Sequence, residues 1–223
     1  MRFNFFRRNF TGWFIGASVF LAMALFAHAA FAATGAIQGS VKVKSAKYAK
    51  DIVVYVKSID GKFAPPKDPV EYDQEKLLFL PHVLPILDGT TVMFLNSDKV
   101  KHNVFSPDFE QFDLGTWAPG GKQKYVFSLL KGKKADKDKK VVEPDPIRAY
   151  VQLCNVHPEM EGYVVVLPNP YFAVTDEKGK FTLKGIPEGR HTLFAWSEKY
   201  KPREVEATVS SKNTTTVTID FTQ

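Results

Sequence analysis

Short runs of β-branched and aromatic residues recur along most of the chain, and turn-forming residues separate them. "LDGT", "APGG", "PNP" and "DEKGK" are turn signals of this kind. No stretch after residue 32 repeats its apolar positions at helical spacing. The pattern therefore predicts an all-β chain of sandwich type. The predicted strand runs are residues 51–59, 90–96, 102–106, 122–130, 147–153, 162–167, 180–185, 191–197, 203–210 and 214–221.

Residues 1–32 break this pattern. The opening "MRFNFFRRNF" is basic, residues 13–32 are predominantly apolar, and Ala30-Phe31-Ala32 fits the small-x-small motif for cleavage. We therefore expect a signal peptide over residues 1–32 and export, most simply to a bacterial periplasm. The alternative is an uncleaved membrane anchor, because the apolar stretch approaches the length that spans a bilayer. Only in that case do we expect membrane association.

The export route has two interpretations. Arg7 and Arg8 resemble the start of a twin-arginine signal, although Thr11 and Gly12 depart from that pattern. Both the general secretory route and the twin-arginine route therefore stay open.

The charge balance argues against a polyanionic partner. The full chain carries 30 basic and 24 acidic residues, a net charge of +6. The three arginines within residues 1–32 leave with the signal, so 27 basic residues face 24 acidic ones, a balance of +3. We expect no nucleic-acid partner from so weak a field. The lysine-rich residues 131–146 also contain acidic residues and no aromatic ring, which predicts a solvated loop.

Cys154 is the one cysteine of the chain. In an oxidising compartment a lone thiol needs protection, either by burial as a small apolar residue or by metal coordination. His157 and Met160 follow at intervals of three residues, in a loop between two predicted strands. A thiolate, an imidazole and a thioether suit copper in a trigonal site of two histidines and one cysteine with a distant methionine.

Such a site needs a second histidine. His28 leaves with the signal, and His191 lies in the C-terminal part of the chain. His82 stands among apolar residues and prolines, which is typical of a core or edge histidine. His102 follows a polar loop at the entry of a strand, so it is the preferred candidate.

Two other chemistries fit this loop less well. Zinc prefers four nitrogen, sulfur or oxygen donors, and a thioether serves it poorly. A cysteine protease would need a local signature that the chain lacks around Cys154.

The motifs "HN" at residues 102–103 and "CNVHPEM" at residues 154–160 resemble those of the cupredoxins, the plastocyanin and azurin superfamily, over residues 60–168. The Cys-x-x-His-x-x-Met spacing is similar to that of amicyanin. Residues 79–98 and 112–122 also look like a periplasmic, methylamine-utilisation-like cupredoxin group. The charged insertion at residues 131–146 departs from compact members.

The resemblance implies a Greek-key β-sandwich with one mononuclear type 1 copper site. His102, Cys154 and His157 would be the equatorial ligands and Met160 the axial ligand. Asn103 would hydrogen-bond across to the ligand loop and hold it closed.

The segment "TDEKGKFTLKGIPEG", residues 175–189, resembles the carboxypeptidase regulatory-like, transthyretin-related β-sandwich. About fifty C-terminal residues contain too few strands to close such a sandwich. Residues 35–58 resemble its opening strands. Our hypothesis is that residues 35–58 and 170–223 form this smaller sandwich and that the cupredoxin domain, residues 60–168, is inserted between them. A tandem arrangement is the alternative.

With all four ligand positions filled by the protein, no position stays open for a substrate, so we do not expect an enzyme. The resemblance implies a periplasmic one-electron carrier that meets redox protein partners by transient contact near His157. The alternative is a copper-handling or carbohydrate-binding accessory protein, in which copper is cargo or structural.

Overall fold

The computed structural model describes residues 33–130 and 147–223. The predicted signal peptide and the lysine-rich segment lie outside these residues. Apart from one short 3-10 helix, Ala46–Tyr48, the regular elements of the described part are strands, so the all-β prediction is confirmed. No helix within the described ranges is long and apolar enough to cross a membrane.

The middle of the chain forms two sheets. A five-stranded sheet has the order β5-β11-β10-β7-β8, and a four-stranded sheet has the order β4-β3-β6-β9. Their shared apolar cluster includes Tyr72, Phe94, Phe127, Tyr150 and Val164. The strands are β3 (Val70–Glu75), β4 (Leu78–Leu80), β5 (Val83–Leu87), β6 (Thr91–Leu95), β7 (His102–Ser106), β8 (Phe112–Trp117), β9 (Lys122–Val126), β10 (Arg148–Leu153) and β11 (Glu161–Leu167).

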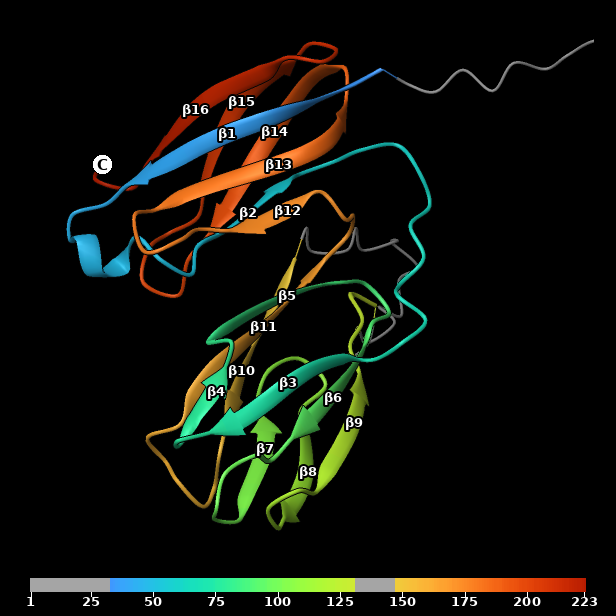
Figure 1. The fold of residues 1–223 in the computed structure, drawn as a ribbon, viewed down its shortest axis with the longest axis vertical. Coiled ribbons are helices and arrows are strands. Elements are labelled where there is room, and N and C mark those ends of the chain that lie inside the picture. The colour runs from blue at the N-terminus through green and yellow to red at the C-terminus, as the bar shows by residue number, and fades with distance from the viewer. Residues whose placement is uncertain (1–32, 131–146) are drawn as a thin grey trace, which may run out of the picture. The chain divides into compact units, whose positions relative to one another are not determined.

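The two ends of the described chain share two further sheets, with the orders β13-β1-β16 and β12-β2-β14-β15. In Figure 1, the blue strand β1 lies between the orange β13 and the red β16. Strand β2 pairs with β12 on one side and with β14 on the other. The strands are β1 (Thr34–Lys42), β2 (Val53–Val56), β12 (Phe172–Val174), β13 (Lys180–Pro187), β14 (Gly189–Trp196), β15 (Arg203–Val209) and β16 (Thr214–Asp220).

Strand β2 and the second half of β11, from Val164, bury both of their faces, which explains their continuous apolar runs. In β2, Val54 and Val56 belong to the core of the sandwich built by the chain ends, whereas Val53 belongs to a separate cluster. In β11, Val164 belongs to the core of the middle sheets, and Val165 belongs to that same separate cluster. These runs therefore contain no polar positions to mark an exposed face.

Strand β5 contains a proline, which lacks the N–H group that a central strand needs. Pro85 is compatible with this strand because β5 lies at the edge of the five-stranded sheet. Its one neighbour there is β11, with Pro85 opposite Val165.

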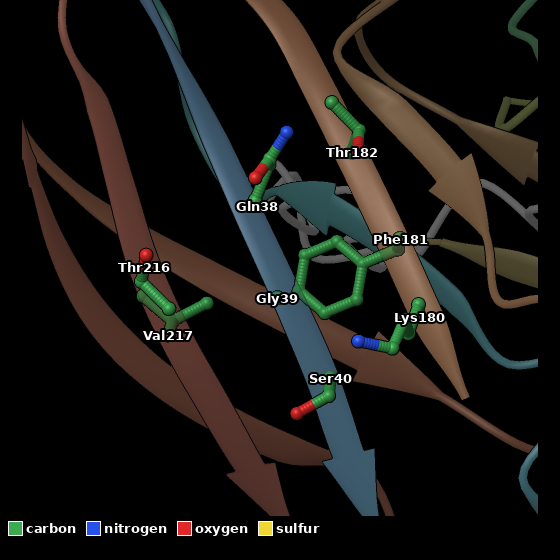
Figure 2. A pocket seen from close by; sticks show the side chains of 8 residues that line it. All are labelled: Gln38, Gly39, Ser40, Lys180, Phe181, Thr182, Thr216 and Val217. Carbon is green, nitrogen blue, oxygen red and sulfur yellow. The ribbon is translucent and has the colours of Figure 1, made fainter. Parts of the chain in front are cut away.

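A glycine on β1 makes room for an aromatic ring. Figure 2 shows the ring of Phe181 lying across β1 at Gly39, in a groove lined by residues of β1, β13 and β16. A Cβ atom at residue 39 would overlap that ring and would lie 2.9 Å from Cγ2 of Val217. The close packing of these three strands therefore depends on the missing side chain.

We expect Gly39→Ala to lower the free energy of unfolding by about 1–3 kcal/mol, because the added methyl group overpacks this core. Chemical denaturation followed by circular dichroism measures the change. Gln38→Ala, on the neighbouring exposed position, is the matched control. Adding Phe181→Leu should recover part of the loss, and an unchanged stability of Gly39→Ala would contradict this account.

Candidate metal centre

Sheet order brings the candidate ligands together. His102 is the first residue of β7, and Cys154 follows directly after the last residue of β10. Strands β7 and β10 are neighbours in the five-stranded sheet, with Phe105 opposite Leu153. The thiol and the imidazole, which are 52 residues apart in sequence, therefore meet at one end of this sheet.

The loop between β10 and β11 adds the second imidazole. Nδ1 of His157 lies 3.1 Å from Nδ1 of His102, and Sγ of Cys154 lies 3.9 Å from that same nitrogen. The donor atoms of the three residues all lie within 4.8 Å of one another. Among the described residues, this is the group of histidine, cysteine and acidic side chains that is close enough to hold a metal ion.

The donor chemistry of this group fits a soft or borderline metal ion. It combines a sulfur atom with two ring nitrogens, and no carboxylate belongs to it. Two ring nitrogens at 3.1 Å must share a proton or a cation, since their lone pairs would otherwise repel each other. The residues present are therefore compatible with copper.

Burial protects the thiol. Cys154 is 2% exposed, and His102 and Met160 are fully buried. Met160 belongs to the same apolar cluster as Cys154, and its N–H group donates to the carbonyl of His157 at 3.0 Å. Only His157 of these four residues is partly exposed. His157 is therefore the one of the four that solvent reaches.

Asn103 connects β7 to the ligand loop through both its backbone and its side chain. Its N–H group donates to Sγ of Cys154 at 3.4 Å, and its Oδ1 accepts from the N–H group of Asn155 at 3.2 Å. Its Nδ2 donates to Oδ1 of Asp113 at 2.6 Å and to the carbonyl of Gly115 at 2.9 Å. Asn103 is 2% exposed, although Asp113, Gly115 and Asn155 are exposed, so water has little access to the Asn103 side of these bonds.

The far end of the ligand loop is held by close packing at a glycine. A Cβ atom at Gly162 would overlap the hydroxyl of Tyr72 and would lie 2.7 Å from Cβ of Phe79. Strands β3 and β4 can therefore approach the start of β11, directly after Met160.

One residue of this centre was missed by the sequence analysis. Oδ2 of Asp98 lies 3.2 Å from Nε2 of His102, the ring nitrogen that points away from Cys154. The N–H groups of Leu77 and Lys99 donate to the same carboxylate and lower the pKa of Asp98 to about 2. The available signal was an acidic residue four positions before a candidate ligand, because ligand histidines commonly donate their second N–H to a carboxylate.

The other described histidines lie outside this group. Nε2 of His82 lies 3.3 Å from a carboxylate oxygen of Glu198, and Nε2 of His191 lies 2.8 Å from the carbonyl of Pro187. Each therefore has a partner of its own.

Comparison with known families matches one part of the chain. The family model of the carboxypeptidase regulatory-like domain matches residues 159–222. The recognition of such a segment is confirmed, although the match begins before residue 170 and includes β11. A comparison with curated proteins gives no significant match.

Solved structures similar to the chain include copper proteins. A copper-containing nitrite reductase from Thermus scotoductus SA-01 is 22% identical with a TM-score of 0.37, over 59% of this chain and 28% of that one. A purple cupredoxin from Nitrosopumilus maritimus is 24% identical with a TM-score of 0.33, over 44% of this chain and 98% of that one. A mutant of amicyanin in its oxidised state is 20% identical with a TM-score of 0.34, over 45% of this chain and 84% of that one. These TM-scores are too low to support a functional argument.

We expect Asn103→Ala to speed the reaction of Cys154 with a thiol reagent in the metal-free protein by about tenfold or more. Losing the bonds of a buried amide costs about 1–3 kcal/mol, and about 1.4 kcal/mol corresponds to a factor of ten. The rate under native conditions measures this opening of the ligand loop. Asn213→Ala, at an exposed asparagine, should react like the wild type. Equal rates for both variants would contradict the role of Asn103.

Proposed function

We propose that this protein binds one copper ion in a type 1 site, with His102, Cys154 and His157 as equatorial ligands and Met160 as the axial ligand. The single observation that carries the proposal is the convergence of one sulfur and two ring nitrogens within 4.8 Å at the end of a β-sheet. The complete burial of Met160 beside Cys154 in one apolar cluster supports its axial role.

Copper in such a site supplies one-electron exchange between its two oxidation states. The residues of this chain hold the donor atoms in place. Strand pairing fixes the positions of His102 and Cys154. The bonds of Asn103 to Cys154 and Asn155 restrain the loop that carries His157, and its two bonds to β8 hold its own amide in place. A restrained ligand set changes little between oxidation states, which favours electron transfer over catalysis. We therefore propose an electron carrier and not an enzyme.

We expect a redox protein partner to bind at the exposed part of the metal centre. His157 is partly exposed, and the neighbouring Val156 is 43% exposed. An apolar side chain beside the exposed ligand suits a small, transient interface. The periplasmic location of this exchange rests on the signal peptide expected over residues 1–32.

For the domain organisation, we propose that residues 35–58 and 170–223 form the carboxypeptidase regulatory-like sandwich, with the cupredoxin domain, residues 60–168, inserted between them. The pairing of β1 with β13 and β16, and of β2 with β12 and β14, supports this division. The family match begins at residue 159, within the ligand loop, and so extends eleven residues before the boundary proposed here at residue 170.

The colour of the copper-loaded protein tests the proposal. We expect an intense visible band from thiolate-to-Cu(II) charge transfer and reversible one-electron voltammetry. Cys154→Ser should abolish the band, because a hydroxyl does not provide this transition. His82→Ala should keep it, because His82 contacts Glu198 outside the site. A colourless, redox-silent protein whose copper is easily chelated would contradict the proposal and favour the accessory alternative.

Copper should also stabilise the folded protein. Free copper at about a hundred times its Kd should add about 2.7 kcal/mol, because the assembled site exists only in the folded state. The rise in the thermal unfolding midpoint measures this effect, and a chelator should reverse it. Cys154→Ser should show little or no rise. A larger rise with zinc than with copper would point to a zinc site instead.

A further inference from the structure

Asp98 contacts a buried candidate ligand from outside the ligand group. It lies in the loop between β6 and β7, and its Oδ2 lies 3.2 Å from Nε2 of His102. The imidazole is fully buried, whereas the side chain of Asp98 is 16% exposed. The carboxylate therefore covers the side of the ring that faces away from Cys154.

This contact selects one tautomer of the imidazole. An ionised carboxylate only accepts hydrogen bonds, so the Nε2 atom of His102 must carry the proton that faces Asp98. The neutral ring then has its lone pair on Nδ1. That atom is the one directed at the site, 3.9 Å from Sγ of Cys154 and 3.1 Å from Nδ1 of His157.

The carboxylate is held so that it does not turn away. The N–H group of Leu77 donates to Oδ2 at 2.8 Å, and the N–H group of Lys99 donates to Oδ1 at 2.9 Å. The N–H group of Asp98 itself donates to Oδ1 of Asn96 at 3.1 Å. Asn96 is buried and also donates to the carbonyl of Val100 at 2.9 Å. Residues of two loops thus fix the orientation of Asp98.

We propose that Asp98 is a positioning residue that presents Nδ1 of His102 to the metal and lowers the reduction potential of the site. This inference rests on the proposed copper site. A carboxylate behind a ligand imidazole increases the basicity of that ligand. Its negative charge also favours the more highly charged Cu(II) over Cu(I), because Coulomb attraction grows with the charge of the ion.

The variants Asp98→Asn and Asp98→Glu separate the effect of the negative charge at residue 98 from the effect of side-chain size. The amide has nearly the size of the carboxylate but no charge, and it offers one acceptor oxygen where Leu77, Lys99 and His102 now share two. Asp98→Glu keeps the charge on a longer side chain. The matched control is Asp220→Asn. Asp220 is the last residue of β16, away from the site, and the hydroxyl and N–H groups of Thr222 lower its pKa to about 2 as well.

We expect Asp98→Asn to weaken Cu(II) binding by about 10–100-fold, as is usual for partners of ligand histidines, and to weaken Cu(I) binding less. Competition with chelators specific for each oxidation state measures the two changes. Each tenfold difference between them raises the potential by about 59 mV for a one-electron couple. Asp98→Glu should stay nearer to the wild type, and Asp220→Asn should equal it.

A metal-free measurement provides the second readout. Nitrogen NMR of the apoprotein should find His102 protonated on Nε2 in the wild type and redistributed between its two tautomers in Asp98→Asn. The same spectra show whether each variant is folded. The measurement therefore does not depend on copper loading.

The outcomes separate this inference from the proposed function. Suppose that the wild type forms the coloured site and that folded Asp98→Asn keeps both the wild-type potential and the wild-type tautomer. Asp98 then only connects two loops through hydrogen bonds, and the inference is wrong. If the wild type forms no coloured site, the proposed function fails, and the tautomer measurement alone then decides whether Asp98 orients His102.

Discussion

The antiparallel pairing of β7 with β10 is the constraint on which the candidate metal centre depends. It brings the first residue of one strand next to the residue that follows the other, so His102 and Cys154 meet. The bond from the N–H group of Asn103 to Sγ of Cys154 then joins the two segments directly. Any change that shifted this register by one residue would turn the imidazole to the opposite face of the sheet.

Around this pairing, buried polar groups restrain the loops of the site. Asn103 restrains the ligand loop, and Asn96 restrains the loop that carries Asp98. Both amides are almost fully buried, where an unpaired polar group would be costly. The energy that keeps these amides paired therefore also helps to keep the donor atoms in place.

Strand content was predictable where strands are rich in β-branched and aromatic residues, and less so elsewhere. The pattern did not predict β3, because Val70–Glu75 interleaves charged residues with the buried Tyr72 and Gln74. It did not predict β5, because Pro85 breaks the run and only an edge position makes the proline acceptable. Strand β5 depends on β11, which is distant in sequence, and β3 pairs with β6 as well as with the adjacent β4.

Sequence patterns alone were enough to predict the all-β class, the turn signature of the carboxypeptidase regulatory-like segment and the clustering of Cys154, His157 and Met160 in one loop. These are local properties, because strand propensity, turn chemistry and loop length depend on adjacent residues. Three features emerge only from the folded chain: His102 contacts Cys154, Asp98 contacts His102 while it accepts from the N–H group of Leu77, and β1 pairs with β13 and β16. Such contacts follow from strand order and register, which depend on the fit of the whole core and are not encoded in any one segment.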